Sequence, residues 1–133
     1  MVCLGNHCRS PYAAAVLTRL GGQAVEVRSA GVRDKHIGRP AHPHMVTVAA
    51  ARGHDLTRHR GQQVTEELIA WADLVLAMDH ANLDAMRTVA TPDTRARLAL
   101  FADDDFPDPW GGTLDDFIVT ADTIDHAAAR YLR

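Results

Sequence analysis

Short apolar runs alternate along this chain with stretches in which apolar residues recur at helical spacing. Such alternation favours a parallel β-sheet whose strands are joined by crossover helices. Strands are expected at residues 2–4, 24–29, 73–78 and 97–101. Helices are expected at residues 10–20, 41–52, 65–70, 81–89 and 114–131. An acidic loop with two prolines and two glycines, residues 102–113, separates the last strand from the last helix. The strand, loop and helix at the N-terminus form the clearest unit of this pattern.

Length and composition fit one compact domain, residues 1–133, with enough apolar content to form a core. Hydrophobic residues make up 47% of the chain, which is typical of a soluble globular protein. No apolar run approaches the roughly 18 residues needed to cross a bilayer, and no secretory signal is apparent. The two cysteines, Cys3 and Cys8, do not provide a disulfide framework. We therefore expect a cytoplasmic protein whose thiols are reactive rather than structural.

Charge is distributed unevenly between the two halves of the chain. Residues 1–60 contain nine Arg and Lys against three acidic residues, about +6, whereas residues 61–133 contain five Arg against fourteen acidic residues, about −9. If the basic residues surround one cleft, they favour an anionic ligand. Alternatively, two oppositely charged faces simply solvate the fold. No polybasic block with interleaved aromatic residues is present, so nucleic acid is not an expected partner.

The segment from Cys3 to Ser10 reads Cys-Leu-Gly-Asn-His-Cys-Arg-Ser and connects the first predicted strand to the first predicted helix. Ser10 and Pro11 suit the N-cap and the first position of that helix. Backbone amides and the helix dipole would then converge on one anion-binding site. The residues predicted to bind phosphate are Leu4, Gly5, Asn6, His7, Cys8, Arg9 and Ser10.

The spacing of Cys3 and Arg9 suits a loop that closes around a tetrahedral dianion. Arg9 offers a planar fork for two phosphate oxygens, and the Cys3 sulfur can lie behind the phosphorus for in-line displacement. Positive potential in the loop favours the thiolate, to which Ser10 could donate a hydrogen bond. Gly5 permits close folding or positive φ, and Asn6 tolerates the left-handed region. The alternative is an inert buried Cys3 and a surface Arg9, which the surrounding residues disfavour.

This loop, from Val2 to Pro11, resembles the signature of low-molecular-weight protein tyrosine phosphatases, and the resemblance extends along nearly the whole chain. Its further landmarks are Ser29-Ala30-Gly31, Gly38-Arg39-Pro40, His59-Arg60 with Gln63-Val64, Met78-Asp79 and Asp108-Pro109-Trp110, several of them closest to the bacterial branch. The resemblance implies a four-stranded parallel sheet flanked by helices on both faces, a phosphatase-I-like three-layer α/β/α fold. It also implies hydrolysis of phosphotyrosine without a metal or cofactor.

A phosphate ester needs a proton on its leaving oxygen, so the acidic loop is the place to seek a general acid. Asp103, Asp104 and Asp105 form a charge run that is more typical of a solvated face. Asp108 differs, because prolines flank it on both sides and an aromatic residue follows. It also matches the general acid in the Asp-Pro-aromatic motif of the family. We assign Asp108 as the catalytic acid; the alternative is an aspartate that only starts a turn.

Two other loop residues leave alternatives open. Cys8 is either a small apolar residue in the first helical turn or, as the resemblance implies, the partner of Cys3 in a reversible protective disulfide. His7 either adds positive charge near the loop or is a surface histidine. The remaining histidines considered lack metal-ligand spacing on one face, so no metal is expected: His36, His42, His44, His54 and His59.

The chain departs from the family pattern at three places. Only Met1 and Val2 precede Cys3, where the family has a longer apolar strand. A late start codon or a trimmed strand is one explanation, on which a longer form is expected to be more stable and more active. Lys35 and Gly111 stand where relatives commonly carry aromatic residues. Lys35 and Trp110 are therefore the candidate substrate-cleft residues, with a weaker preference for aryl groups and Lys35 available for acidic residues or additional phosphate on the substrate.

The leading hypothesis is a protein tyrosine phosphatase acting on phosphorylated proteins, with inorganic phosphate as product, no membrane partner and a monomer as the expected state. An arsenate reductase is less favoured, because no further cysteine follows Cys8 to relay a disulfide. A phosphoprotein-binding module without turnover is the third reading. The retention of Cys3, Arg9 and Asp108 argues against that reading, since binding alone needs neither a nucleophile nor an acid.

Overall fold

The computed structural model describes residues 1–103 and 105–131 as a parallel sheet between two layers of helices. The four strands are β1 (Val2–Cys3), β2 (Ala30–Gly31), β3 (Val75–Ala77) and β4 (Leu98–Leu100). They lie in the order β2-β1-β3-β4, and every pairing is parallel. The predicted four-stranded α/β fold is thus confirmed. Asp104, part of the predicted solvated acidic run, lies outside the described residues.

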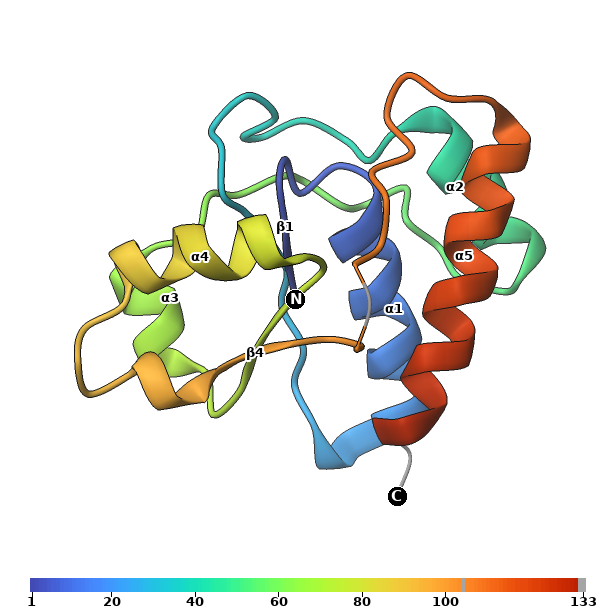
Figure 1. The fold of residues 1–133 in the computed structure, drawn as a ribbon. Helices are drawn as coiled ribbons and strands as arrows, with labels where there is room; N and C mark the ends of the chain where they lie inside the picture. Colours follow the sequence, from blue (N-terminus) through green and yellow to red (C-terminus); the bar gives the residue numbers. More distant parts are fainter. Residues whose placement is uncertain (104, 132–133) are drawn as a thin grey trace.

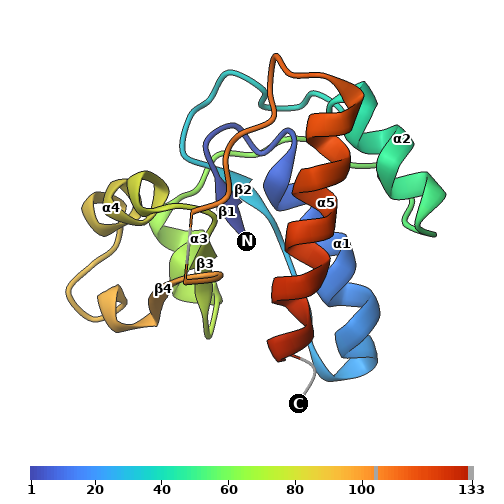
Figure 2. The same ribbon diagram turned by 45° about the vertical axis from the view of Figure 1, so that its right-hand side comes forward.

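In the described part of the chain, five α-helices surround this sheet. They are α1 (Arg9–Gly21), α2 (Pro43–Ala51), α3 (Glu66–Trp71), α4 (His80–Val89) and α5 (Leu114–Ala128). Short 3₁₀ turns span Gly22–Ala24, Arg95–Arg97 and Ala129–Tyr131. Figures 1 and 2 show α1 and α5 side by side on one side of the sheet, with α3 and α4 on the other. Within the described part of the chain, none of the helices combines the length and apolar character needed to cross a bilayer.

Alternation along the strands divides the core into two clusters. Cys3 and Leu76 point into the cluster formed with α1, α2 and α5, where Tyr12, Met45 and Phe117 are fully buried. The neighbouring residues of the same strands, among them Val2, Val75 and Ala77, join the second cluster, which includes residues of α3 and α4. Since both faces of the sheet are covered, the strands are apolar throughout, as expected for a parallel sheet.

Most predicted element boundaries lie within three residues of those in the structure, and two predictions differ in a way that has a physical reason. The strand predicted at residues 24–29 lies at Ala30–Gly31 instead, and residues 25–29 belong to neither a helix nor a strand. A strand requires a paired neighbour, and β1 pairs with this part of the chain only at Ala30 and Gly31. The first helix begins at Arg9, with Cys8 rather than Ser10 as its N-cap, so Pro11 is the third helical residue. It ends at Gly21, one residue beyond the predicted end, and Gly22 has φ of 55° at the C-cap.

Candidate active site

The loop between β1 and α1 is fixed by Asn6, which is buried and has φ of 53°. Asparagine is among the few residues that adopt the left-handed region readily. Its side-chain Nδ2 donates to Ser10 Oγ and Ser29 Oγ, each at 2.9 Å, and its Oδ1 accepts the backbone amide of Gln62 at 3.0 Å. The ring of His59 lies 2.8 Å through Nε2 from the Asn6 carbonyl oxygen. Asn6 therefore ties the loop to three other segments of the chain.

Two glycines allow neighbouring groups to approach this loop closely. A Cβ atom at Gly31 would lie 2.7 Å from the Gly5 carbonyl carbon and 2.8 Å from the Asn6 nitrogen. A Cβ atom at Gly5 would lie 2.9 Å from Cδ2 of His36. Gly5 is therefore needed for close approach rather than for positive φ, since Asn6 is the loop residue that has positive φ.

Cys3 ends β1 with its side chain buried and its Sγ 3.1 Å from Ser10 Oγ. This contact matches the predicted hydrogen bond between the two side chains. The second predicted role of Ser10 is wrong, because Cys8 occupies the N-cap and no side chain caps α1. Ser10 instead lies in the first turn of the helix and accepts from Asn6. Its hydroxyl is thereby available to donate to the sulfur of Cys3.

Arg9 is almost completely buried, and two groups from the second half of the chain hold its guanidinium. Its Nη1 donates to Asp79 Oδ2 at 2.8 Å and to the carbonyl oxygen of Phe106 at 2.7 Å. Its Nη2 lies 3.6 Å from Asp108 Oδ2. The buried Nε has no hydrogen-bond partner among the residues that the structure describes. A buried donor without a partner is costly, so this guanidinium is suited to an anionic ligand.

A pocket of about 150 Å³ opens over the loop and brings together residues predicted from distant segments. Asp108 lines it together with Cys3, and the Asp108 side chain is 36% exposed. Trp110 and Lys35 form part of its wall, with Lys35 Nζ 4.6 Å from the centre of the indole ring. The remaining lining residues are Leu4, Gly5, His7, Cys8, Arg33 and His36. The predicted nucleophile, acid and cleft residues thus share one pocket.

Histidine rings stack at the rim of this pocket. His7 and His36 lie nearly parallel with ring centres 4.0 Å apart, and His42 meets His7 edge-on at 5.3 Å. Partial burial, followed by the neighbouring His36 and His42, lowers the pKa of His7 to about 4. His7 therefore lies in an aromatic stack and carries no charge at neutral pH. The hypothesis that it adds positive charge to the loop is not favoured there.

Cys8 lines the same pocket and is 2% exposed. Burial raises the pKa of its thiol, and the charge of Asp108 acts in the same direction. Both cysteines are free. These properties match the small apolar role considered for Cys8, since a neutral buried thiol packs as a hydrophobic group. No group of three or more metal-binding side chains occurs within residues 1–103 and 105–131.

Asp79 is a candidate functional residue that sequence reasoning did not assign. It caps α4 by accepting the amide of Asn82 at 2.7 Å, and the same carboxylate holds Arg9. Its position directly after the third predicted strand was visible in the sequence, and parallel strands end at a common edge of the sheet. Ser29 was visible only as part of a landmark and Gln62 was not singled out, although both fix Asn6.

The fold and the site together define a class of α/β proteins in which the first strand leads through a loop with a buried cysteine and a buried arginine into a helix. The family model described as low molecular weight phosphotyrosine protein phosphatase matches residues 1–133. The chain therefore belongs to this family.

Two curated relatives illustrate the range of similarity. A probable low molecular weight protein-tyrosine-phosphatase, EpsP of Ralstonia nicotianae, is 48% identical over 61% of this chain and 54% of that protein. The chain thus spans about half the length of this relative. A protein-arginine-phosphatase of Geobacillus stearothermophilus is 36% identical over 93% of this chain and 86% of its own length.

Solved structures resemble the whole fold. Vibrio vulnificus Wzb in complex with benzylphosphonate superposes with a TM-score of 0.93 at 33% identity, covering 98% of this chain and 93% of that one. The tyrosine phosphatase Wzb of Escherichia coli K30 in complex with sulphate gives a TM-score of 0.91 at 30% identity, with coverages of 98% and 92%. The three-layer architecture is accordingly shared across the family.

Removing the charge of Asp79 should weaken anion binding while preserving the fold. Asp79→Asn keeps an N-cap for α4 but loses the ion pair with Arg9. Hydrogen bonds to charged groups are worth about 1.5–3 kcal/mol, so we expect inorganic phosphate to bind about 10- to 100-fold more weakly by calorimetry. Asp84→Asn on the same helix, which breaks an exposed pair with Arg87, is the matched control. Equal phosphate affinity in both variants would contradict this role.

Acid should destabilise the protein through His7. Because the pKa of His7 is lowered to about 4 from 6.5, the unfolded chain binds more protons than the folded chain between these values. Stability is therefore retained above pH 6.5 and lost as the pH falls toward 4. We expect His7→Gln to flatten the dependence of melting temperature on pH in this window, and His126→Gln on the exposed side of α5 to leave it unchanged. If the melting temperature of His7→Gln falls with pH as steeply as that of the unaltered protein, His7 is not the source of the acid destabilisation.

Proposed function

We propose that this protein is a protein-tyrosine phosphatase that hydrolyses phosphotyrosine and related aryl phosphate monoesters through a phosphocysteine intermediate. The observation that carries this proposal is the meeting of Cys3 and Asp108 in one pocket, beside a buried Arg9 whose Nε lacks a partner among the described residues. Membership of the family supports the same activity. In this proposal residues 1–133 act as one catalytic domain, and the protein functions in the cytoplasm.

The first chemical step transfers the phosphoryl group to sulfur. The Cys3 thiolate attacks phosphorus, the bond from phosphorus to the ester oxygen breaks, and protonated Asp108 donates its proton to the leaving phenolate. Arg9 and the loop amides balance the charge on the other phosphate oxygens. The Ser10 hydroxyl, 3.1 Å from the sulfur, stabilises the thiolate before attack.

The second step releases inorganic phosphate. Ionised Asp108 accepts a proton from water, whose oxygen attacks phosphorus while the bond to sulfur breaks and the Cys3 thiolate is restored. The exposed position of Asp108 at the mouth of the pocket supports both roles, because water and the leaving group reach the carboxyl from the same side. No redox partner is needed, since the oxidation state of sulfur does not change.

Substrate choice follows from the pocket wall. The indole of Trp110 offers an aromatic face to a phenyl ring. The benzylphosphonate complex of the Vibrio vulnificus relative supports an aryl phosphate in the equivalent site. Phosphoarginine is the competing substrate, because one relative is a protein-arginine-phosphatase. Arg33 and Lys35 disfavour it, since cationic groups at the mouth repel a guanidinium substrate and attract an acidic one.

Substitution of the proposed nucleophile and acid tests the mechanism. Cys3→Ser should lose hydrolysis of an aryl phosphate entirely, while still binding a phosphotyrosine peptide. Asp108→Asn should lower kcat about 10²–10⁴-fold for a poor leaving group, because the phenolate then departs without a proton. This loss should shrink as the leaving group becomes more acidic. Asp115→Asn, on an exposed carboxylate of α5, is the control.

Three results separate the alternatives. Turnover that persists in Cys3→Ser rules out the phosphocysteine mechanism. Tight phosphopeptide binding by the unaltered protein without any turnover favours the binding-module reading. Faster hydrolysis of a phosphoarginine peptide than of the matched phosphotyrosine peptide indicates a protein-arginine phosphatase instead.

The basic wall should also favour acidic neighbours of the phosphorylated residue. Among the described residues, neither Arg33 nor Lys35 has a carboxylate within 4.0 Å, so both charges are available to a ligand. We expect a higher kcat/KM for phosphotyrosine peptides flanked by Asp or Glu than for neutral ones, and a steeper decline of that ratio with salt. Arg33→Gln and Lys35→Gln should each reduce the ratio, whereas Arg95→Gln should not. If kcat/KM for the acidic peptides is unchanged in both Arg33→Gln and Lys35→Gln, the proposed preference for acidic neighbours is wrong.

A further inference from the structure

A contact between Lys35 and Trp110 joins two walls of the pocket over the phosphate loop. Lys35 Nζ lies 4.6 Å from the centre of the indole ring, within the range in which an ammonium group is attracted to an aromatic face. Lys35 belongs to the segment after β2, and Trp110 belongs to the loop before α5. Both residues line the pocket, so the covered face of the indole is the one turned towards the segment after β2.

This contact can open without breaking any other bond between the two segments. In the described part of the chain, neither a hydrogen bond nor an ion pair joins residues 32–40 to residues 105–113. Lys35 is exposed and has no carboxylate within 4.0 Å among the described residues. Trp110 is 55% exposed. Since cation–π contacts at exposed sites are weak, a ligand can separate these two side chains.

A phenyl ring cannot stack on the covered face of the indole while Lys35 remains there. Stacked aromatic rings need a separation between ring centres of at least about 4.5 Å, and Lys35 Nζ occupies that space. A ring placed between the ammonium group and the indole would need roughly twice the usual contact distance of about 3.5–4.0 Å. An aryl substrate must therefore displace Lys35 before it stacks on this face of Trp110.

We propose that Lys35 selects phosphotyrosine sites with acidic neighbours by covering the indole of Trp110 until a carboxylate of the substrate draws its ammonium group away. This inference rests on the proposed phosphatase function and specifies the substrate class of that site. A neutral aryl phosphate displaces the ammonium group without offering it another partner. An acidic substrate gives Lys35 a carboxylate and frees the indole for the phenyl ring. The exchange is balanced, because ion pairs and cation–π contacts at exposed sites are similar in strength.

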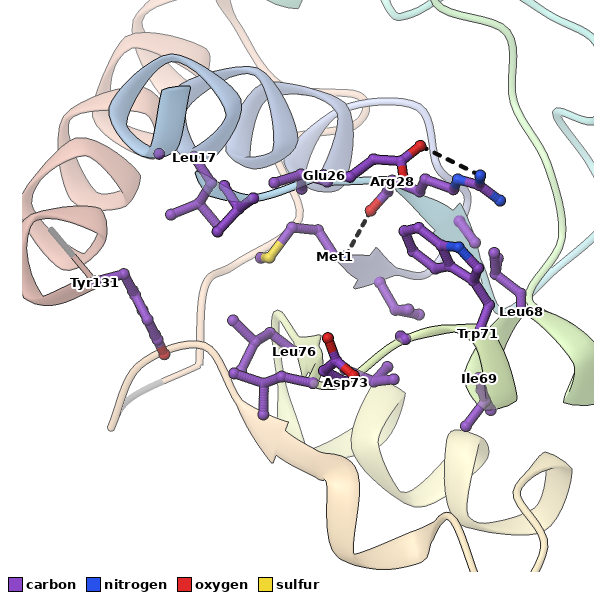
Figure 3. Close-up of a pocket in the computed structure, with 18 of the residues that line it drawn as sticks. Met1, Leu17, Glu26, Arg28, Leu68, Ile69, Trp71, Asp73, Leu76 and Tyr131 are labelled. Atoms are coloured by element: carbon purple, nitrogen blue, oxygen red, sulfur yellow. Dashed lines mark hydrogen bonds and ion pairs between the residues drawn. The ribbon is translucent and has the colours of Figure 1, made fainter. Parts of the chain in front are cut away.

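A second contact of the same kind, between Arg28 and Trp71, provides a reference elsewhere in the molecule. The guanidinium carbon of Arg28 lies 3.9 Å from the centre of the Trp71 ring (Figure 3). Arg28 Nη2 also lies 3.3 Å from a carboxylate oxygen of Glu26. These three residues line a larger pocket of about 520 Å³, which shares no lining residue with the pocket over the phosphate loop. Loss of this contact should therefore not affect a ligand of the phosphate loop.

The test compares two anions that differ by an aromatic ring, benzylphosphonate and inorganic phosphate, by calorimetry. Lys35→Ala uncovers the indole, so the ratio of the benzylphosphonate to the phosphate association constant should rise about two- to fivefold. Simple attraction between Lys35 and an anion predicts no rise, because it acts on both ligands. Lys35→Arg keeps a cation that stacks on aromatic rings and should not raise the ratio. Arg28→Ala, the matched control, should leave it unchanged.

Phosphotyrosine peptides test the part of the proposal that concerns acidic neighbours. They are bound to the Cys3→Ser variant, so that turnover does not interfere. A peptide with acidic neighbours should bind more tightly than a neutral peptide, and adding Lys35→Ala should narrow this difference from both sides. The acidic peptide loses an ion pair, whereas the neutral peptide gains the uncovered indole. If Lys35→Ala weakens the acidic peptide without tightening the neutral one, Lys35 only attracts charge and the proposal is wrong.

The remaining outcomes distinguish this inference from the proposed function. An unchanged ratio of association constants in Lys35→Ala, or an equal rise in Lys35→Arg or Arg28→Ala, overturns the role of Lys35. Such a result does not affect the phosphatase activity, which hydrolysis of an aryl phosphate by the unaltered protein tests separately. A raised ratio in a protein that hydrolyses no aryl phosphate supports the covering contact and rejects the activity.

Discussion

The buried amide of Asn6 is the interaction on which the rest of the site depends. Its left-handed backbone reverses the chain between Cys3 and Arg9, and its side chain bonds to Ser10, Ser29 and the backbone of Gln62. One residue thereby joins the loop to α1, to the end preceding β2 and to the segment before α3. A loop held in this way is fixed before any ligand arrives, which is the preorganisation that anion binding and electrostatic catalysis require.

The positive charge of Arg9 is also held in place within the site before any ligand binds. A buried guanidinium is tolerated only with partners, and here the partners are Asp79 and the Phe106 carbonyl, both from the opposite half of the chain. Both partners accept from Nη1 of Arg9, whereas its Nε has no partner among the described residues. The uneven charge of the two halves has its structural meaning at this point: the basic half supplies the loop, and the acidic half positions its arginine and brings Asp108 into the pocket that Cys3 lines.

Much of this arrangement could be predicted from sequence, because the loop is local. The strand, the Cys3 to Ser10 segment and the helix are contiguous, so spacing alone indicates an anion site. The candidate acid Asp108 could be predicted from the sequence, because two prolines and Trp110 distinguish it from the other aspartates of the acidic loop. Asp79 was not assigned, since its contact with Arg9 spans 70 residues and depends on the order of the strands. The N-cap was placed at Ser10 because serine is a common capping residue, but the hydroxyl is held instead by Asn6 and Cys3.

The second strand was predicted at residues 24–29 but lies at Ala30–Gly31, and the short length of β1 is the reason. Residues 24–29 carry a strand-like pattern, yet a strand exists only where a neighbour pairs with it, and β1 reaches no further back than Val2. The same β1 holds the sulfur of Cys3 against Ser10. A two-residue central strand positions the nucleophile with few ladder bonds, so the loop depends more heavily on Asn6 and on the buried core beneath Cys3.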